Sequence, residues 1–304
     1  MRRPIKWSNV ECRMTKEEGI RKGIPAPDFD LAKTLDSGQV FHWESLGEGF
    51  IGMIGDEPVQ LAQQDDQLLV RRGRGELVRR YFALDHPLAE ICASLPNDPV
   101  MQAAQDYCRG LRIIRQPRWE CLATFITSSM KQVAHIRQIS WALRARFGSR
   151  FPIAGRELFS FPNAERLART NEKDLRRCAL GYRAKNLLAT ARLVASGKID
   201  LEAFALLPDE ELRRQLCALP GVGSKVANCV MLFGYERLCA FPIDVWVERV
   251  LREKYFPRRR RITARELRTF AANHFGEHGG YAQQYLFHHA RKTTARRRLS
   301  PRPR

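Results

Sequence analysis

The sequence lacks long apolar runs and closely paired cysteines. No stretch of its 304 residues approaches the apolar length of a membrane-spanning helix, and residues 1–7 contain no apolar core of a secretory signal. None of the eight cysteines forms a Cys-x-x-Cys pair, which argues against a metal site and against a disulfide framework. We therefore expect reduced, buried thiols, no bound metal, and an intracellular, reducing compartment.

The chain is also short of acidic residues. It carries 52 lysines and arginines against 33 aspartates and glutamates, which gives a formal net charge of +19. Such an excess predicts a polyanionic partner, nucleic acid first and an anionic membrane second. A membrane binder would need a basic amphipathic face, whereas the basic residues here cluster in loops, as at 258–261, and in the segment 292–304. We therefore expect a nucleic acid, and no membrane, as the partner.

Residues 219–227, Leu-Pro-Gly-Val-Gly-Ser-Lys-Val-Ala, contain the turn around which the other motifs are arranged. The pattern predicts one helix before it, at 209–217, and another after it, at about 225–234. A proline and two glycines between two helices fit only a tight turn, so the stretch predicts a helix, a hairpin and a helix. Its backbone, with the unpaired first amides of the second helix, can bind a phosphate. The phosphate-binding candidates are Gly221, Val222 and Gly223.

Lys225 occupies the first turn of the second helix, where the helix dipole disfavours a cation and so favours the neutral, nucleophilic amine. Position alone leaves open a surface lysine that touches phosphate. Asp244 follows nineteen residues later, and the intervening chain is long enough to return to the lysine. Asp244 is also placed to cap a helix predicted at 245–256. It is therefore either only a cap or a carboxylate held near the Lys225 amine.

The N-terminal part of the chain is predicted to form one twisted antiparallel sheet. After the irregular residues 1–25, alternation begins behind a Ser-Gly turn and continues to residue 43. Further strands are predicted at 50–54, 59–62 and 67–70. From about Leu77 the apolar spacing becomes helical. The main helices are predicted at 88–95, 99–111, 119–129, 133–147 and 184–195.

The 219–227 motif, followed by Phe-Pro-Ile-Asp-Val at 241–245, resembles the helix-hairpin-helix DNA glycosylase superfamily and, within it, the 8-oxoguanine DNA glycosylases. The similarity runs from about Phe29 to Arg291. It implies an α+β fold in which an N-terminal antiparallel sheet domain packs on a mainly helical body. Endonuclease III-like relatives carry a four-cysteine iron–sulfur cluster, whereas this chain has no cysteine after Cys239. The expected parts are 1–115 (sheet domain with linking helices), 116–291 (helical body, with the helix-hairpin-helix at about 209–234) and 292–304 (a disordered basic tail).

The resemblance also assigns roles in a pocket for a damaged base. It places the Gly38 carbonyl, in Ser-Gly-Gln-Val-Phe, where it accepts the N7 hydrogen that 8-oxoguanine has and guanine lacks. Gln283 and Phe287, four apart on the last helix, match the pair that reads the base edge and stacks on its face. Cys229 matches a cysteine that packs on the other face. From the residues alone, Gly38 could be only a turn glycine, Phe287 a core side chain and Gln283 a surface one.

The segment after Ser-Ser at 128–129 departs from the family pattern. Typical 8-oxoguanine glycosylases have an asparagine that fills the gap left by the flipped base and an arginine five residues later, where this chain has Met130 and His135. Arg183 matches a further arginine at the opposite base, although it could also lie in a solvated loop. Since two of three cytosine-reading groups are changed, we expect a relaxed preference for the opposite base, unless Lys131 or Gln132 compensates.

The resemblance implies a monomeric, bifunctional DNA glycosylase and apurinic-site lyase of base excision repair, acting on double-stranded DNA that contains oxidised purines. Lys225 would attack C1′ of the flipped nucleotide and form a Schiff base, while Asp244 stabilises the developing positive charge. No cofactor is expected; a monovalent cation on the hairpin carbonyls is the one exception left open. A monofunctional alkylpurine glycosylase and a non-catalytic helix-hairpin-helix DNA-binding protein remain alternatives. The expected location is on DNA, in a bacterial cytoplasm or a eukaryotic nucleus.

Overall fold

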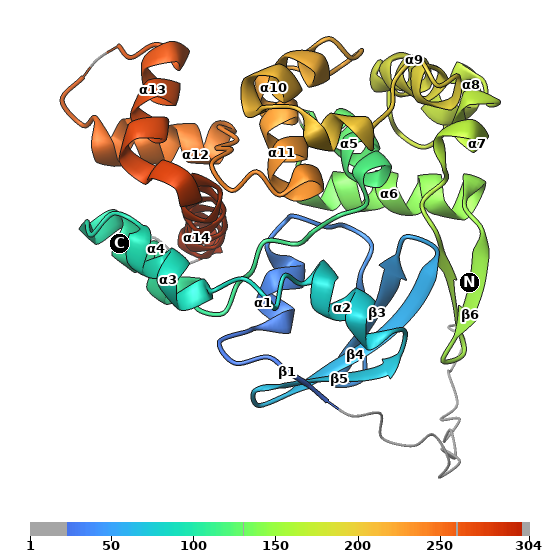
Figure 1. The fold of residues 1–304 in the computed structure, drawn as a ribbon, viewed down its shortest axis with the longest axis horizontal. Coiled ribbons are helices and arrows are strands. Elements are labelled where there is room, and N and C mark those ends of the chain that lie inside the picture. The colour runs from blue at the N-terminus through green and yellow to red at the C-terminus, as the bar shows by residue number, and fades with distance from the viewer. Residues whose placement is uncertain (1–22, 130, 260, 300–304) are drawn as a thin grey trace, which may run out of the picture.

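The structure is a computed structural model that describes residues 23–129, 131–259 and 261–299. A sheet domain lies against a larger helical body (Figure 1), which confirms the predicted α+β fold. The sheet is antiparallel and five-stranded, with the strand order β1-β5-β4-β3-β2. The strands are β1 (Ile24–Pro25), β2 (Glu44–Leu46), β3 (Gly49–Ile54), β4 (Glu57–Gln64) and β5 (Gln67–Arg72).

Both predicted and unpredicted elements cover the sheet. Apolar side chains of β4 and β5 share a core with those of α1 (Leu31–Asp36) and α2 (Gly75–Tyr81). Side chains of β3 pack instead against a hairpin of the helical body, β6 (Arg150–Ile153) and β7 (Arg156–Phe159). Both α1 and this hairpin are additions to the predicted set, and the hairpin fixes the body to the sheet.

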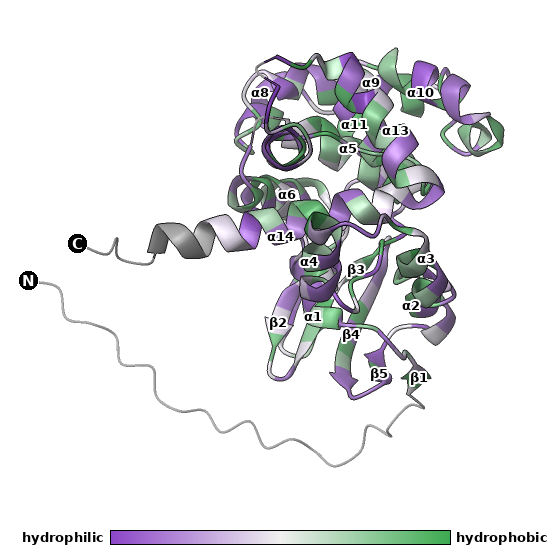
Figure 2. Ribbon diagram, turned by 90° about the vertical axis from the view of Figure 1, so that its left-hand side faces the viewer, coloured by the Kyte–Doolittle hydropathy of each residue, from purple (hydrophilic) through white to green (hydrophobic). Residues whose placement is uncertain are grey.

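Two buried helices form the centre of the helical body. Both α5 (Arg118–Ser128) and α11 (Ser224–Tyr235) are largely buried, and they contact each other. Figure 2 shows their hydrophobic residues in the interior, whereas α8 at the edge is largely hydrophilic. The surrounding helices are α3 (Leu88–Ser94), α4 (Pro99–Tyr107), α6 (Val133–Phe147), α7 (Ala164–Ala168), α8 (Glu172–Arg176), α9 (Arg183–Ala195), α10 (Asp209–Cys217), α12 (Val245–Val250), α13 (Ala264–Phe275) and α14 (Gly279–Leu299). The single-turn segments are η1 (Ala203–Leu206), η2 (Leu251–Tyr255) and η3 (Gly276–His278).

Three details differ from the expectations. The segment 39–43 is not a strand: the Gln39 side chain bonds the Arg112 carbonyl and the Ile114 amide, in place of a strand ladder. The residues of α3 and α4, expected among the linking helices of the sheet domain, belong to the core of the helical body. Residues 292–299, expected to be disordered, continue α14 to Leu299.

A buried ion pair lies at the junction of the two parts. Glu120 on α5 pairs with Arg144 on α6, and His42 from the sheet domain approaches the same carboxylate at 3.5 Å. The other ring nitrogen of His42 lies 2.8 Å from the Met53 carbonyl. Burial, aided by the Arg144 charge, lowers the pKa of His42 well below its usual value, so the ring is neutral and donates to that carbonyl. The negative charge of Glu120 is therefore balanced by Arg144, and His42 stays neutral.

Candidate active site

The hairpin between α10 and α11 has the predicted form. Gly221 has a φ of +81°, and a Cβ there would lie 2.8 Å from the Asn186 side chain, so only glycine fits without a shift. Gly223 is the N-cap of α11 and has open space around it, so no side chain caps the first amides of the helix. Val222 differs from the glycines because its side chain is buried and anchors the turn. The exposed backbone of this hairpin suits a phosphate.

Lys225 lies in the first turn of α11, as predicted, and is half-buried. Its amine is 5.2 Å from the ring centroid of Phe125, which lies beneath it on α5. Among the described residues it forms no ion pair, so its amine is not neutralised by a carboxylate in direct contact. A half-buried lysine at a helix N-terminus can act as a nucleophile once its amine is neutral.

Asp244 acts as a cap and also takes part in the electrostatics of Lys225. Its Oδ1 accepts hydrogen bonds from the amides of Trp246, at 3.0 Å, and Val247, at 2.9 Å. Burial raises the pKa of the carboxyl, while the Val247 amide and the Lys225 charge act in the opposite direction. Burial likewise raises the pKa of the Cys229 thiol. The Lys225 charge lowers this pKa, whereas the Asp244 charge raises it. Lys225 and Asp244, each at a helix N-terminus, therefore act electrostatically on the same buried thiol.

The predicted base pocket has one wall formed by Gly38 and α14. Gly38 has a φ of +88°, and a Cβ on it would lie 3.0 Å from Cε1 of Phe287. Gln283, one turn earlier on α14, is only 4% exposed, and its Oε1 has no hydrogen-bond partner among the described residues. The alternative of a surface glutamine is therefore wrong. A buried amide oxygen without a partner is costly, which points to a ligand that supplies a donor.

The three candidates for contact with the opposite base do not form one described cluster. Met130 lies outside the described residues. His135 is exposed in the first turn of α6. Arg183 is buried, so the solvated-loop alternative is wrong: its Nε donates to the Ser129 carbonyl at 2.8 Å, its Nη2 donates to the same oxygen, and its Nη1 donates to the Leu180 carbonyl at 3.4 Å.

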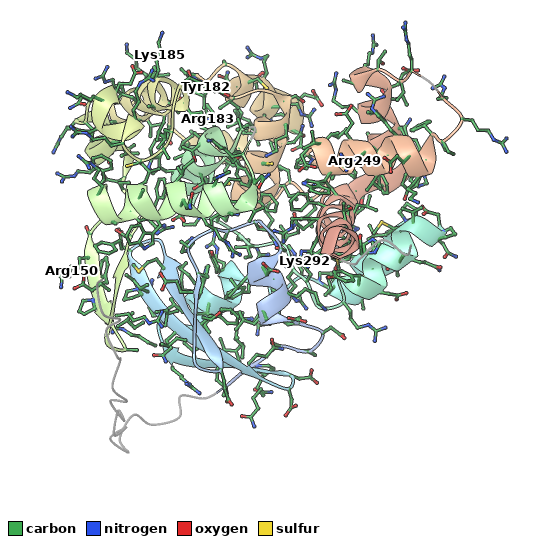
Figure 3. All side chains as sticks on the ribbon, turned by 180° about the vertical axis from the view of Figure 1, so that it is seen from behind. Arg150, Tyr182, Arg183, Lys185, Arg249 and Lys292 are labelled. Atoms are coloured by element: carbon green, nitrogen blue, oxygen red, sulfur yellow. The ribbon has the colours of Figure 1, made fainter. Side chains whose placement is uncertain are left out.

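Arg183 is also stacked on a neighbouring aromatic ring. Its guanidinium lies 4.4 Å from the ring centroid of Tyr182, which is more than half exposed. Figure 3 shows these two residues and Lys185 together at the start of α9. With three of its N–H groups directed to backbone carbonyls, Arg183 supports the end of α5 in addition to any contact with DNA.

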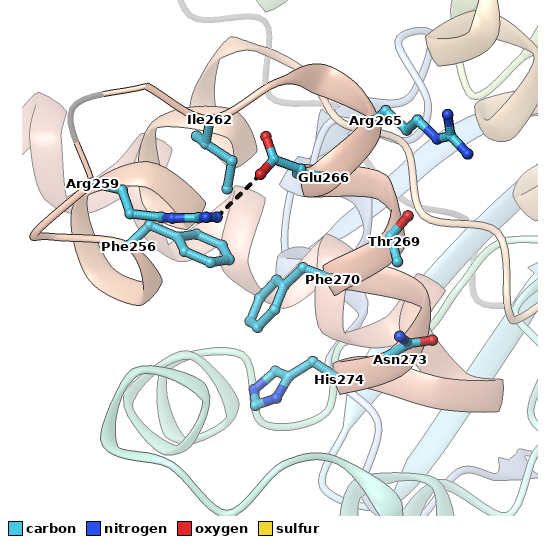
Figure 4. A pocket seen from close by; sticks show the side chains of 9 residues that line it. All are labelled: Phe256, Arg259, Ile262, Arg265, Glu266, Thr269, Phe270, Asn273 and His274. Carbon is cyan, nitrogen blue, oxygen red and sulfur yellow. Dashed lines mark hydrogen bonds and ion pairs between the residues drawn. The ribbon is translucent and has the colours of Figure 1, made fainter.

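Neither of two surface cavities coincides with the predicted base pocket. An open one of about 570 Å³ is lined by α13 and the segment before it (Figure 4), and none of the predicted site residues lines it. A smaller one of about 130 Å³ is lined in part by Lys225, Asn228 and Arg268. The described residues contain no group of histidines, cysteines and acids able to hold a metal ion. Among them, no helix is long and apolar enough to cross a membrane.

Two family models match the chain in succession. Residues 23–122 match the 8-oxoguanine DNA glycosylase N-terminal domain, and residues 123–273 match the HhH-GPD superfamily of base excision DNA repair proteins. A probable N-glycosylase/DNA lyase of Methanothermobacter thermautotrophicus is 28% identical over 89% of this chain and 96% of its own length. The N-glycosylase/DNA lyase of Saccharomyces cerevisiae is 30% identical over 81% of this chain and 73% of its own length. A solved structure of the Clostridium acetobutylicum 8-oxoguanine glycosylase/lyase holds double-stranded DNA with cytosine opposite 8-oxoguanine. That protein is 29% identical to this chain, and the match covers 90% of this chain and 99% of the other, with a TM-score of 0.84.

Proposed function

Because the chain belongs to the 8-oxoguanine DNA glycosylases of the helix-hairpin-helix superfamily, we infer that it removes 8-oxoguanine from double-stranded DNA and nicks the strand at the resulting abasic site. It is a bifunctional N-glycosylase and DNA lyase of base excision repair. The observation that supports the assignment of the reactive groups is that Lys225, at the N-terminus of α11, and Asp244, at the N-cap of α12, interact electrostatically with each other and with buried Cys229.

We propose Lys225 as the nucleophile. The target C1′ is out of reach in a duplex, so the nucleotide must flip, at a cost of a few kcal/mol. The neutral Lys225 amine forms a bond to C1′ as the bond to N9 breaks, and the electron pair leaves with the base, which takes up a proton. Opening of the sugar ring gives a Schiff base with the lysine. Loss of a C2′ proton then expels the 3′ phosphate, which is the β-elimination that nicks the strand.

Asp244 supports this step through its charge. The anomeric carbon becomes positively charged as the base departs, and a carboxylate fixed by two amide hydrogen bonds is already oriented to stabilise that charge. The Lys225 charge in turn favours the ionised form of Asp244, since it lowers the pKa that burial raises.

The pocket wall supplies the lesion preference. The Gly38 carbonyl accepts the N7 hydrogen of 8-oxoguanine, Phe287 stacks on the base, and Gln283 bonds its edge through the oxygen that lacks a partner. Cys229, buried one turn after Lys225, packs on the second face of the base. Guanine lacks the N7 hydrogen, so it would leave the Gly38 carbonyl unpaired and be disfavoured.

We propose a relaxed choice of the base opposite the lesion. His135 can donate at most one hydrogen bond when neutral, and it cannot form the two-pronged contact of an arginine. Arg183 already directs three N–H groups to the Ser129 and Leu180 carbonyls. Each lost bidentate base contact removes about 1–3 kcal/mol of discrimination. The rates opposite the four bases should therefore be closer together than in a family member with the usual asparagine and arginine.

We propose that the protein binds DNA as a monomer, along the hairpin and the start of α9. The exposed Gly221 and Gly223 backbone binds phosphate, and the excess of positive charge adds affinity that is independent of sequence and falls with salt. We propose an intracellular site of action on DNA, with no metal and no cofactor in the reaction.

Single-turnover assays on three matched duplexes test the function. We expect base release and strand nicking with 8-oxoguanine, and neither with 3-methyladenine nor with an undamaged duplex. Sodium borohydride should trap the wild type on the 8-oxoguanine duplex, and Lys225→Gln should abolish trapping while it retains DNA binding. Base release without a trapped species would favour a monofunctional glycosylase, and binding without base release would favour a DNA-binding protein.

A further inference from the structure

Helix α14 holds the backbone immediately before Gly38 at two successive carbonyls. The Gln284 amide donates to the Ser37 carbonyl at 3.0 Å, and Nη2 of Arg291 donates to the Asp36 carbonyl. Gln284 is buried, whereas Arg291 is partly buried at the point where α14 leaves the body. The position of Gly38 relative to α14 therefore depends on these two side chains.

Arg291 also contacts the other member of the pocket wall. Its guanidinium carbon lies 5.6 Å from the ring centroid of Phe287, one turn earlier on α14. Phe287 is in turn the side chain nearest to a Cβ built on Gly38. Arg291 therefore joins the stacking ring to the Gly38 loop: its nitrogen fixes the loop, and its guanidinium covers one face of the ring. An aromatic ring has two faces, which leaves the other face for a base.

The surroundings of Arg291 are arranged to hold it in this position. His288 is 3% exposed, and its Nδ1 lies 3.3 Å from Nη2 of Arg291. Burial and the Arg291 charge lower the pKa of His288 to about 4, so the ring is neutral and its nitrogen can accept from the guanidinium. Arg291 contacts Asp36 at its backbone carbonyl, whereas the Asp36 side chain pairs with Lys292 and Arg137. The guanidinium is thus placed by its partners on several sides.

We propose that Arg291 is a positioning residue for lesion recognition, which holds the Gly38 carbonyl and the Phe287 ring at a fixed separation. This inference rests on the proposed function, because it concerns the contact between Gly38 and the N7 hydrogen of 8-oxoguanine. The far side of Gly38 is already fixed, since the Gln39 side chain bonds the Arg112 carbonyl and the Ile114 amide, at 2.8 Å each. The side before Gly38 depends on α14 through Gln284 and Arg291, so loss of Arg291 removes one of the two bonds that hold it.

The reason for a large effect is that recognition depends on one hydrogen bond. Guanine and 8-oxoguanine are alike in size and stacking, so discrimination requires the Gly38 carbonyl to meet a hydrogen that only the lesion carries at N7. A displacement of about 1 Å in a reacting geometry costs about a hundredfold in rate. The cleavage of an abasic site has no base to recognise, so it does not depend on this wall.

The test uses Arg291→Met in the full chain, with Lys292→Met as the matched control. Lys292 is the next residue on α14 and pairs with the Asp36 side chain, but it has no contact with the Phe287 ring in the structure. Single-turnover excision of 8-oxoguanine and nicking of a preformed abasic site are measured for each variant, together with the Tm. Arg291→Met should lose about a hundredfold in excision, with abasic nicking and Tm close to the wild type. Lys292→Met should match the wild type in all three.

A conservative variant provides a second criterion. Arg291→Lys retains a cation near Phe287 and one donor for the Asp36 carbonyl, so its excision rate should lie between those of Arg291→Met and the wild type. Unchanged or faster excision in Arg291→Met would overturn the inference, since it would place Arg291 outside the pocket wall or in the path of the base. An equal loss of excision and abasic nicking would also overturn it. Failure of the wild type itself to nick abasic DNA would instead contradict the proposed function.

Discussion

Replacing Asp244 with asparagine separates its role as a cap from its role as a charge. One oxygen, Oδ1, accepts both amide hydrogen bonds, from Trp246 and Val247. The carbonyl oxygen of asparagine in the same place keeps both bonds, and Asn caps helices about as well as Asp. We therefore expect the free energy of unfolding to change by no more than about 0.5 kcal/mol.

The sign of that small change follows from the pKa. Burial raises the pKa of Asp244 above that of the unfolded chain, so the ionised carboxyl is a cost to the fold. This cost is absent below the unfolded pKa, grows as the pH rises from there to the raised pKa, and is complete above it. Asparagine carries no such cost, so Asp244→Asn should be as stable as the wild type at low pH and equal or slightly more stable at neutral pH.

The excision rate of Asp244→Asn, unlike its stability, should fall sharply. Loss of a fixed charge aimed at the developing positive charge should slow excision by about 10² to 10³. The wild-type rate should also rise with pH as Asp244 ionises, above the usual range of an aspartate, and this rise should be missing in the variant. The measurements are single-turnover excision across pH and urea unfolding of the same preparations.

A second helix cap provides the matched control. Asp98 caps α4 with the same geometry, accepting through Oδ1 from the amides of Val100 and Met101, each at 2.9 Å. Asp98→Asn should leave excision unchanged, because this cap is not part of the proposed site. If Asp244→Asn excises as fast as the wild type with its fold intact, then Asp244 is only a cap and the electrostatic argument is wrong.

Three further predictions concern the pocket, the opposite base and the core. Phe287→Ala should weaken binding of an 8-oxoguanine duplex by about 1–3 kcal/mol in fluorescence anisotropy; equal weakening on a duplex with an abasic analogue would exclude a stacking role. Met130→Asn with His135→Arg should sharpen the preference for cytosine in excision opposite the four bases, and strong cytosine selectivity already in the wild type would contradict the reasoning. Arg144→Met should destabilise the protein by about 3–5 kcal/mol in urea unfolding, since it leaves Glu120 buried and unpaired; Glu120→Gln in the same background should recover part of this loss.

The parts of the fold that local patterns determine were predictable from the sequence. The helix 133–147 and the helix 209–217 have the predicted bounds, because their apolar spacing is regular and their ends carry glycine, proline or a clear change of pattern. The hairpin and the placing of Asp244 at a helix N-cap were likewise predictable, since glycine and aspartate have strong positional preferences.

Features that depend on distant contacts were not predictable in this way. The alternating segment 39–43 has the pattern of a strand, but Gln39 pairs with residues more than seventy positions away, and no local rule includes that partner. The basic composition after Lys292 indicated disorder, whereas α14 continues from a buried helix and Lys292 pairs with Asp36. The roles of Gln283 and Arg291 in the pocket wall likewise depend on where Gly38 lies in the fold.

In the proposed reaction, Lys225 becomes covalently bonded to C1′ of the damaged nucleotide. This bond is tested most directly by reducing the wild-type reaction on an 8-oxoguanine duplex with borohydride, digesting the adduct and locating the sugar by mass spectrometry. We expect a single modified peptide with the sugar remnant on Lys225. A remnant on another lysine or on the N-terminal amine, in an enzyme that excises 8-oxoguanine at its normal rate, would contradict the proposed role of Lys225.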